Sequence, residues 1–262
     1  MLTIGIDSGN LNTKAVALRN GEVVGRVKSA TGFDAQQTAV AALEMLLRET
    51  GLRRDNVDAI AATGVGRQLA DCATVRINEV GSAARGAHLV CPALRIVIDM
   101  GAEGCRAVKM DDAGRPQKYE VNDRCASGAG TFVESMARTL QIKTEEMGAY
   151  SLRHSKDVPM NAQCVVFAES EVISLIHRRE TVEDIAHGIH AGIASRVAAL
   201  MRRLGVTAGI GFIGGPANNA GLGQCLEDVL KQRVAVPDFP EYISALGAAA
   251  FAADQLETEQ KE

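Results

Sequence analysis

Residues 2–30, LTIGIDSGNLNTKAVALRNGEVVGRVKSA, carry the clearest fold signal in the chain. An apolar run ends at Asp7, a polar turn follows, and Asn20-Gly21 lies between two further apolar runs. Asn-Gly between apolar runs is the strongest short-range indication of a β-hairpin. We therefore expect three antiparallel strands at the start of the chain.

The turn from Asp7 to Lys14 has the composition of a phosphate-binding turn. It places a carboxylate at the end of a strand, a glycine beside it, and hydroxyl, amide and ammonium groups shortly after. These are the groups that hold a phosphate and its magnesium ion. An ordinary polar hairpin has a similar composition, so this turn alone is a weak indication.

The same arrangement recurs near the middle of the chain. An apolar strand at 94–100 carries Asp99, Gly101 follows in a turn, and two more strands are expected at 105–110 and 117–122. A repeat of this kind predicts two similar α/β halves that face each other across a cleft.

A third glycine turn, Gly214-Gly215, follows an apolar strand expected at 209–213. Two glycines between a strand and a helix allow a planar base or ribose to lie against the backbone. A tight strand-to-helix turn explains the two glycines equally well.

Apolar residues at helical spacing predict a helix at 35–50, with Gly51 as its C-terminal stop, and a long helix at 185–204. His187 and His190 lie on the second helix. A histidine on an amphipathic helix is more often packed or solvated than a ligand, so neither is assigned a role. The small-residue segment at 77–87 is suited to close packing and is interpreted as structural.

Two segments each place one cysteine before an apolar stretch that predicts a helix: 122–134, NDRCASGAGTFVE, and 161–171, NAQCVVFAESE. For one segment alone, a glycine-rich turn followed by a buried cysteine is the better interpretation. Two similar segments favour a shared role for Cys125 and Cys164. A zinc ion or an iron–sulfur cluster needs about four ligands. If these cysteines hold a cluster, a second polypeptide must supply the other pair.

The composition describes a globular protein of 262 residues, with 47% apolar residues, 3% aromatic residues and a net charge of -4. The absence of a basic surplus and the few aromatics argue against nucleic-acid binding. No apolar run has the roughly 18 residues of a spanning helix, and no signal peptide is recognisable at the start. We expect a cytoplasmic protein without membrane contact. The six cysteines are too scattered for a secreted disulfide framework.

Asp7-Ser-Gly with Lys14, Asp99-Met-Gly, and Gly214-Gly215 occur in the order typical of the sugar kinase, actin and heat-shock chaperone superfamily. The motifs NDRCASGAGTFVESMA, CVVFAESEVISLI and GIHAGIASRV narrow the resemblance. With them, the chain closely resembles the activators of 2-hydroxyacyl-CoA dehydratases and the related ATP-binding subunits of benzoyl-CoA reductase.

This resemblance implies an actin-like ATPase fold with two ribonuclease H-like lobes around a nucleotide cleft. Lobe I would span 1–93, lobe II with the cysteine motifs 94–238, and a C-terminal helix at 239–262 would pack back between them. It also implies a 4Fe-4S cluster at a dimer interface, held by Cys125 and Cys164 of each of two subunits, with ATP/ADP and Mg²⁺ as further cofactors.

Position by position, the resemblance assigns catalytic roles to Asp7, Asp99 and Glu103. The implied nucleotide-binding residues are Gly9, Asn10, Asn12, Thr13, Lys14, Gly101, Gly214, Gly215 and Asn219. The chain departs from the dehydratase activators where they read Gly-Gly-Gln-Asp, since Gly101-Ala-Glu-Gly104 stands here. Glu103 thus replaces an amide at the position that would orient the attacking water. This turn is more similar to the benzoyl-CoA reductase subunits, in which two different ATP-binding chains pair.

The implied activity is ATP-driven electron transfer to a dehydratase or reductase component. The partner would be a second copy or a paralogous ATP-binding chain, and a ferredoxin or flavodoxin would donate the electrons. One alternative is a sugar or pantothenate-like kinase of the same fold, with Asp99 as the base. Another is a nucleotide-dependent assembly protein without iron.

Overall fold

The hairpin predicted from Asn20-Gly21 is present in the computed structural model, which describes residues 1–122, 130–160 and 164–259. Both turn residues have positive φ, 51° at Asn20 and 86° at Gly21. A type I′ hairpin turn needs this conformation at both central residues. The three antiparallel strands are confirmed as β1 (Leu2–Ser8), β2 (Asn12–Arg19) and β3 (Glu22–Ala30).

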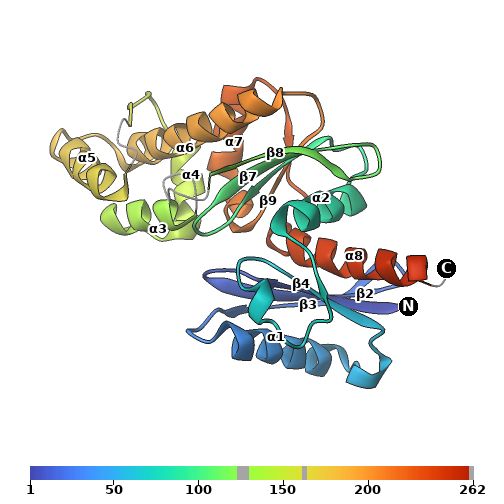
Figure 1. Ribbon diagram of the computed structural model, residues 1–262. Helices are drawn as coiled ribbons and strands as arrows, with labels where there is room; N and C mark the ends of the chain where they lie inside the picture. Colours follow the sequence, from blue (N-terminus) through green and yellow to red (C-terminus); the bar gives the residue numbers. More distant parts are fainter. Residues whose placement is uncertain (123–129, 161–163, 260–262) are drawn as a thin grey trace. The chain divides into compact units, whose positions relative to one another are not determined.

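The first sheet is completed by two parallel strands. β4 (Ala59–Thr63) pairs with β1, and β5 (Val75–Arg76) pairs with β4, giving the order β3-β2-β1-β4-β5. Helix α1 (Ala35–Thr50) connects β3 to this parallel part, beginning after the N-cap Asp34 and ending at Gly51 with φ 67°. Figure 1 shows α1 on one face of the sheet and α8 (Ile243–Glu259) on the other.

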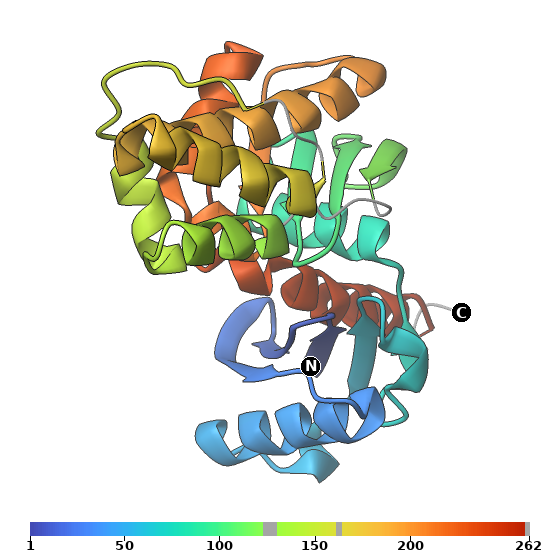
Figure 2. The ribbon, with the colours of Figure 1, turned by 90° about the vertical axis from the view of Figure 1, so that its left-hand side faces the viewer.

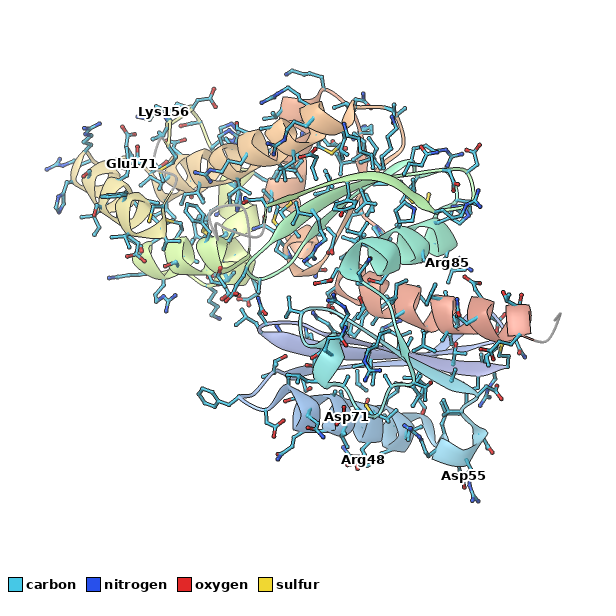
Figure 3. All side chains as sticks on the ribbon, in the orientation of Figure 1. Arg48, Asp55, Asp71, Arg85, Lys156 and Glu171 are labelled. Atoms are coloured by element: carbon cyan, nitrogen blue, oxygen red, sulfur yellow. The ribbon has the colours of Figure 1, made fainter. Side chains whose placement is uncertain are left out.

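Helix α2 (Glu79–Val90) packs so closely against α8 that only glycine fits at two positions between the helices. A Cβ on Gly86 would lie 2.1 Å from the Ile243 carbonyl oxygen, and one on Gly247 would lie 1.9 Å from the Ser82 oxygen. Arg85, labelled in Figure 3, adds two hydrogen bonds of 2.7 and 2.9 Å to Asp254 of α8. The small-residue packing predicted for 77–87 is therefore present.

The second sheet repeats the order of the first. Its order is β10-β9-β6-β7-β8, with β6 antiparallel to β7 and parallel to β9. Read from β8, this order matches that from β3 in the first sheet, as the internal repeat predicted. The strands are β6 (Ile96–Met100), β7 (Cys105–Met110), β8 (Pro116–Asn122), β9 (Ile210–Ile213) and β10 (Val234–Ala235).

Five helices accompany the second sheet within the described residues: α3 (Gly130–Thr139), α4 (Met147–Ser151), α5 (Val165–His177), α6 (Val182–Leu204) and α7 (Ala220–Leu230). In Figure 2, α3 and α5 run side by side. Their inner faces join α6 in one apolar core that includes Met136, Val172 and Ile189. Short 3₁₀ turns occur at Arg54–Asn56, Arg67–Leu69, Thr144–Glu146, Gly215–Asn218 and Pro240–Tyr242.

The contacts between residues divide the chain into two compact units. The first contains Met1–Leu94, Met110–Gln117 and Glu241–Glu262, and the second contains Arg95–Lys109 and Lys118–Pro240. The placement of 239–262 between two lobes stays a prediction, as do the lobe boundaries. In the part of the chain that the structure describes, no helix has both the length and the apolar character needed to cross a bilayer.

Candidate functional site: two carboxylate turns and an exposed cysteine

The first candidate turn begins with an ion pair across the β1–β2 ladder. Asp7 and Lys14 are register partners on the two strands, and Lys14 Nζ lies 3.1 Å from Asp7 Oδ2. Their side chains are 14% and 16% exposed for Asp7 and Lys14 respectively. Half-buried charges of opposite sign hold each other in place more strongly than exposed ones. The pair keeps a carboxylate and an ammonium group fixed at the end of β1.

The turn after β4 lies directly against this carboxylate. Gly64 has φ 86°, and a Cβ there would approach within 2.6 Å of Asp7 Oδ1 and 2.5 Å of the Ser8 oxygen. A Cβ on Gly66 would lie 2.3 Å from Ser8 Oγ. Gly64 is required by its left-handed conformation and by lack of space, and Gly66 by lack of space alone. The two glycines therefore let the end of β1 and the end of β4 meet.

Residues after Asp7 divide into buried and accessible positions. Thr13 is fully buried, and its hydroxyl pairs with Thr31 Oγ1 at 2.8 Å, which in turn donates to the Gly9 carbonyl at 2.9 Å. Thr13 thus stabilises the turn from inside, whereas Asn10 is exposed and Asn12 is half-buried. The hydrogen bonds of Thr13 and Thr31 therefore hold the turn in place before any ligand binds.

Arg67 and Glu79 form an interaction that the sequence did not indicate. Arg67 Nη1 lies 2.9 Å from Glu79 Oε2 at the start of α2 and 2.9 Å from the Gly64 carbonyl oxygen. One guanidinium group therefore fixes the glycine turn that lies against Asp7. Glu79 lies in the segment 77–87, which the sequence analysis interprets as structural, and its spacing of twelve positions from Arg67 forms no recognisable motif.

The second candidate turn has an ion pair at the position equivalent to the ion pair of the first. Asp99 on β6 is the register partner of Arg106 on β7, and Arg106 Nη1 lies 3.0 Å from Asp99 Oδ2. Asp99 is 6% exposed. A buried carboxylate is stable in its charged form only with such a partner. Each sheet therefore carries an aspartate on its central strand opposite a cation on the neighbouring antiparallel strand.

Gly214 corresponds to Gly64 in this second half. It has φ 93°, and a Cβ would lie 2.0 Å from the Met100 oxygen and 3.2 Å from Asp99 Oδ1. Its amide donates to the Pro240 carbonyl at 2.9 Å. The next residue, Gly215, has open space where a side chain would stand. Gly214 is thus fixed by packing, and Gly215 leaves room for a ligand.

The loop at 101–104 is hydrogen-bonded to the first residues of α3. Gly101 closes the loop by donating to the Gly104 oxygen at 2.8 Å, and its own oxygen accepts from the Gly130 amide at 2.9 Å. The Ala102 oxygen accepts from the Thr131 amide at 2.9 Å and from its hydroxyl at 2.8 Å. Glu103 is exposed at the tip of this loop. The loop and the start of α3 are therefore held together by three hydrogen bonds.

Asn219 makes structural hydrogen bonds in addition to its predicted role in nucleotide binding. Its side chain accepts from the Leu222 amide at 3.0 Å as the N-cap of α7, and its Nδ2 lies 3.1 Å from His190 Nε2. Burial lowers the pKa of His190 to about 3, so this imidazole is neutral. Nucleotide binding by Asn219 stays a prediction.

The cysteines fall into different environments. Cys105 and Cys225 are buried, and desolvation raises the pKa of each thiol to about 12. Cys164 is exposed at the N-cap position of α5. Cys125 lies outside the described residues, so the proximity of the two cysteines stays a prediction.

Helix α5 exposes apolar side chains next to Cys164. Val166 is 65% exposed and Phe167 70% exposed, and Ile173 and Ile176 are exposed further along the helix. The opposite face packs into the core through Ala168, Val172 and Leu175. A helix with apolar residues on both faces is typical of an element that another protein covers.

Comparison with known proteins gives matches along nearly the whole chain. The chain is 35% identical over 262 residues to the 2-hydroxyisocaproyl-CoA dehydratase activator of Clostridioides difficile, covering 100% of this chain and 98% of that protein. It is 35% identical to a benzoyl-CoA reductase subunit of Thauera aromatica, covering 96% and 93%. The structure of the Clostridium difficile activator with bound ADPNP superposes with a TM-score of 0.94, covering 100% and 97% of the two chains.

More distant structures share the fold alone. A ROK family glucokinase from Streptomyces griseus has a TM-score of 0.62 at 15% identity, covering 97% of this chain and 100% of that one. The predicted actin-like ATPase fold is confirmed by these neighbours. A shared fold at 15% identity does not support the alternative that this protein is a kinase.

The expected resemblance to dehydratase activators and benzoyl-CoA reductase subunits is also confirmed, and with it the expectation of an ATPase. Residues 4–252 match the family described as the BadF/BadG/BcrA/BcrD ATPase family. With this match, and with full-length relatives at 35% identity, the chain belongs to the BadF/BadG/BcrA/BcrD ATPase family.

Proposed function

We propose that this protein couples ATP hydrolysis to the delivery of low-potential electrons to a 2-hydroxyacyl-CoA dehydratase or a benzoyl-CoA reductase component. The single observation that carries the proposal is Cys164, exposed at the head of a helix with an uncovered apolar face, in a chain whose relatives are named activators and reductase subunits.

ATP and its magnesium ion would be bound through the two carboxylate turns. Asp7 and Asp99 each have a fixed cationic neighbour, which would orient the carboxylate for magnesium or its water shell. Lys14 would compensate phosphate charge, and Gly215 would leave room for the adenosine. Glu103 would orient the attacking water from its exposed loop. Catalysis of phosphoryl transfer rests on such positioning and charge neutralisation.

Coupling between the nucleotide and the cysteines would run through α3. The loop at 101–104 is bonded to Gly130 and Thr131, and the segment with Cys125 ends where α3 begins. ATP and ADP shift an equilibrium only by their differential affinity for its two states. A loop conformation that only ATP favours would therefore move the start of α3.

Cys125 and Cys164 would supply two of the four thiolates of a 4Fe-4S cluster. The donor chemistry fits at Cys164, whose thiol is exposed while Cys105 and Cys225 are buried in the core. Such a cluster, when bound, supplies one-electron transfer at a potential set by its surroundings. The other two thiolates would come from a second copy or a paralogous chain, whose α5 would cover Val166 and Phe167.

The remaining partners follow from the same proposal. The acceptor would be a dehydratase or reductase component, and a ferredoxin or flavodoxin would supply the electrons. Since an ATPase motor of this kind makes each electron transfer dependent on nucleotide turnover, reduction of the acceptor is expected to stop when ATP is replaced by a non-hydrolysable analogue.

Replacing Cys164 by serine should remove the iron from the anaerobically purified protein. Serine keeps the shape but is a poor ligand for iron, and a cluster needs all four thiolates. Iron and sulfide analysis with an absorption spectrum measures the loss. Cys72→Ser is the matched control, because Cys72 is half-buried and outside both cysteine motifs. Equal iron in Cys164→Ser and wild type would contradict the proposal.

A further inference from the structure

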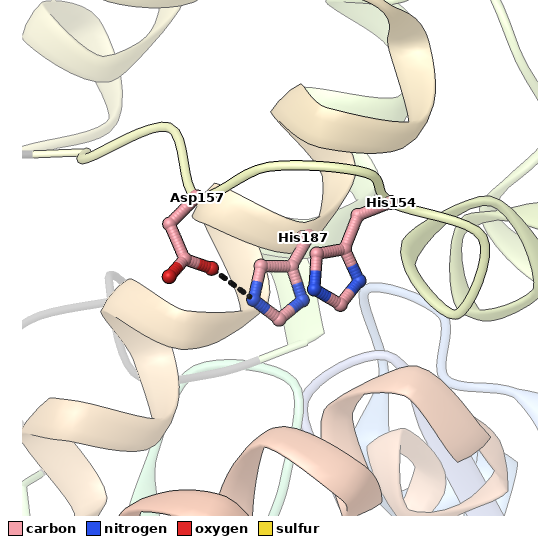
Figure 4. Close-up of side chains that lie close together, drawn as sticks. All are labelled: His154, Asp157 and His187. Carbon is pink, nitrogen blue, oxygen red and sulfur yellow. Dashed lines mark ion pairs between the residues drawn. The ribbon is translucent and has the colours of Figure 1, made fainter.

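Three side chains able to bind a metal lie together in the second unit, and none of them belongs to the proposed nucleotide-binding residues or the cysteine motifs. His154 and Asp157 belong to the segment after α4, and His187 belongs to α6. One ligand atom of each lies within 4.8 Å of the others. Figure 4 shows the His187 ring between the ring of His154 and the carboxylate of Asp157. Two imidazoles and one carboxylate are a donor set that proteins use for zinc.

The two histidine rings lie face to face, and since an imidazole binds a metal in its own ring plane, the exposed His154 ring must turn to share one ion with His187. Their centroids are 3.5 Å apart and their planes differ by 5°. His154 Nδ1 lies 2.9 Å from the Ser151 carbonyl oxygen, and since a carbonyl only accepts, Nδ1 is the donor and Nε2 is the nitrogen left to bind a metal. His187 Nδ1 faces Cys225 Sγ at 3.7 Å. Metal-binding histidines usually have such a partner on the nitrogen that does not bind the metal.

The segment that carries His154 and Asp157 is anchored to α6 independently of these ligands. Asp184 Oδ1 accepts from the amide of Ser155 at 2.7 Å and from that of Lys156 at 3.1 Å. Asp184 stands one helical turn before His187, on the same face of α6. The two residues between the ligands are therefore tied to the helix that supplies the third ligand. This anchoring holds the backbone between the two ligands in place before a metal binds, so that a turn of the exposed His154 ring completes the site.

A simple ion pair explains only part of this arrangement. His187 Nε2 lies 3.3 Å from Asp157 Oδ1, which would suffice for a pair if His187 were protonated. That pair leaves out His154, although the ring of His154 is in contact with the ring of His187. A single cation bound by both rings and the carboxylate satisfies all three groups.

We propose that His154, Asp157 and His187 bind a divalent transition metal of the zinc class, with water completing the coordination. The metal would fasten the segment 154–157 to α6. This segment continues along α6, where a Cβ on Gly188 would lie 2.2 Å from the Val158 oxygen, and then leads to Cys164. The metal would thus stabilise the segment that precedes the exposed cysteine in the chain. Neither Cys125 nor Cys164 would bind it.

Calorimetric titration of the full-length chain with Zn²⁺ tests the site. The titration is run on the double variant Cys125→Ser/Cys164→Ser, so that these two thiols do not compete. We expect about one equivalent to bind, and the affinity to fall more than about tenfold when Asp157→Asn or His154→Asn is added. Both side chains are exposed, so the substitutions leave the core intact. His177→Asn, at the exposed end of α5, is the matched control and should bind zinc as before.

X-ray absorption at the zinc edge gives an independent readout. The site predicts a first shell of nitrogen and oxygen atoms and no sulfur. The proposal is overturned if the double variant binds no zinc, if Asp157→Asn and His154→Asn bind it as tightly as His177→Asn does, or if sulfur is found in the first shell. None of these outcomes affects the role proposed for Cys164, because the cysteine variants are tested by iron content.

Discussion

Asp99→Asn should lower the rate of ATP hydrolysis by about 10²–10³-fold, the effect of removing one electrostatic contact to a reacting phosphate. Asparagine has nearly the same shape, so β6 and the close approach of Gly214 are preserved, but the negative charge that would hold magnesium is lost. Steady-state phosphate release at saturating Mg·ATP measures the effect. Asp7→Asn is expected to behave similarly, since Asp7 occupies the equivalent position in the first sheet.

Asp55→Asn is the control for this prediction. Asp55 also pairs with an arginine, Arg53, at 3.4 Å, but its side chain is 80% exposed, and it is labelled in Figure 3 at a 3₁₀ turn of the first unit. Its loss should leave hydrolysis unchanged. If Asp99→Asn hydrolyses ATP at the wild-type rate while thermal unfolding shows an intact fold, the catalytic role of Asp99 is wrong.

Gly247→Ala should destabilise the first unit by about 1–3 kcal/mol or more, although alanine is a better helix former than glycine. The added Cβ would lie 1.9 Å from the Ser82 oxygen and 2.7 Å from the Gly86 amide nitrogen, and both are backbone atoms that cannot rotate away. Helices α2 and α8 must therefore separate. Hydrogen exchange of the α2 and α8 amides, with the thermal midpoint, measures the loss.

Gly223→Ala provides the matched comparison. Gly223 is also inside a helix, α7, but open space surrounds the position where its Cβ would stand. Here the same substitution should stabilise the helix by about 0.5–1 kcal/mol. If both variants shift stability in the same direction, packing between α2 and α8 is not what requires Gly247.

The sequence predicted the repeat well because local signals agree with it. Asn20-Gly21 predicted one hairpin, Gly51 predicted the end of α1, and the two Asp-x-Gly turns appeared at equivalent places in the two sheets. Each of these signals depends on a few adjacent residues. Turn conformations and helix caps are decided locally, so they can be read without knowledge of the tertiary structure.

Side-chain partners distant in sequence were not predictable in the same way. Lys14 was recognised as part of a phosphate turn, but its pairing with Asp7 and the parallel pairing of Asp99 with Arg106 depend on strand register. The contact of Arg67 with Glu79 depends on how α2 packs. Likewise His187 was set aside as an ordinary helical histidine, because nothing in the sequence places His154 and Asp157 beside it.

Native mass spectrometry of the anaerobically purified protein, combined with iron and sulfide analysis, tests the central claim most directly. The claim is that two chains share one cluster, with Cys164 of each chain among its ligands. The prediction is a particle of two chains, each of 27.7 kDa, that carries about four irons and four sulfides in total. A single chain that holds about four irons by itself, or a two-chain particle that keeps its iron after Cys164→Ser, would contradict it.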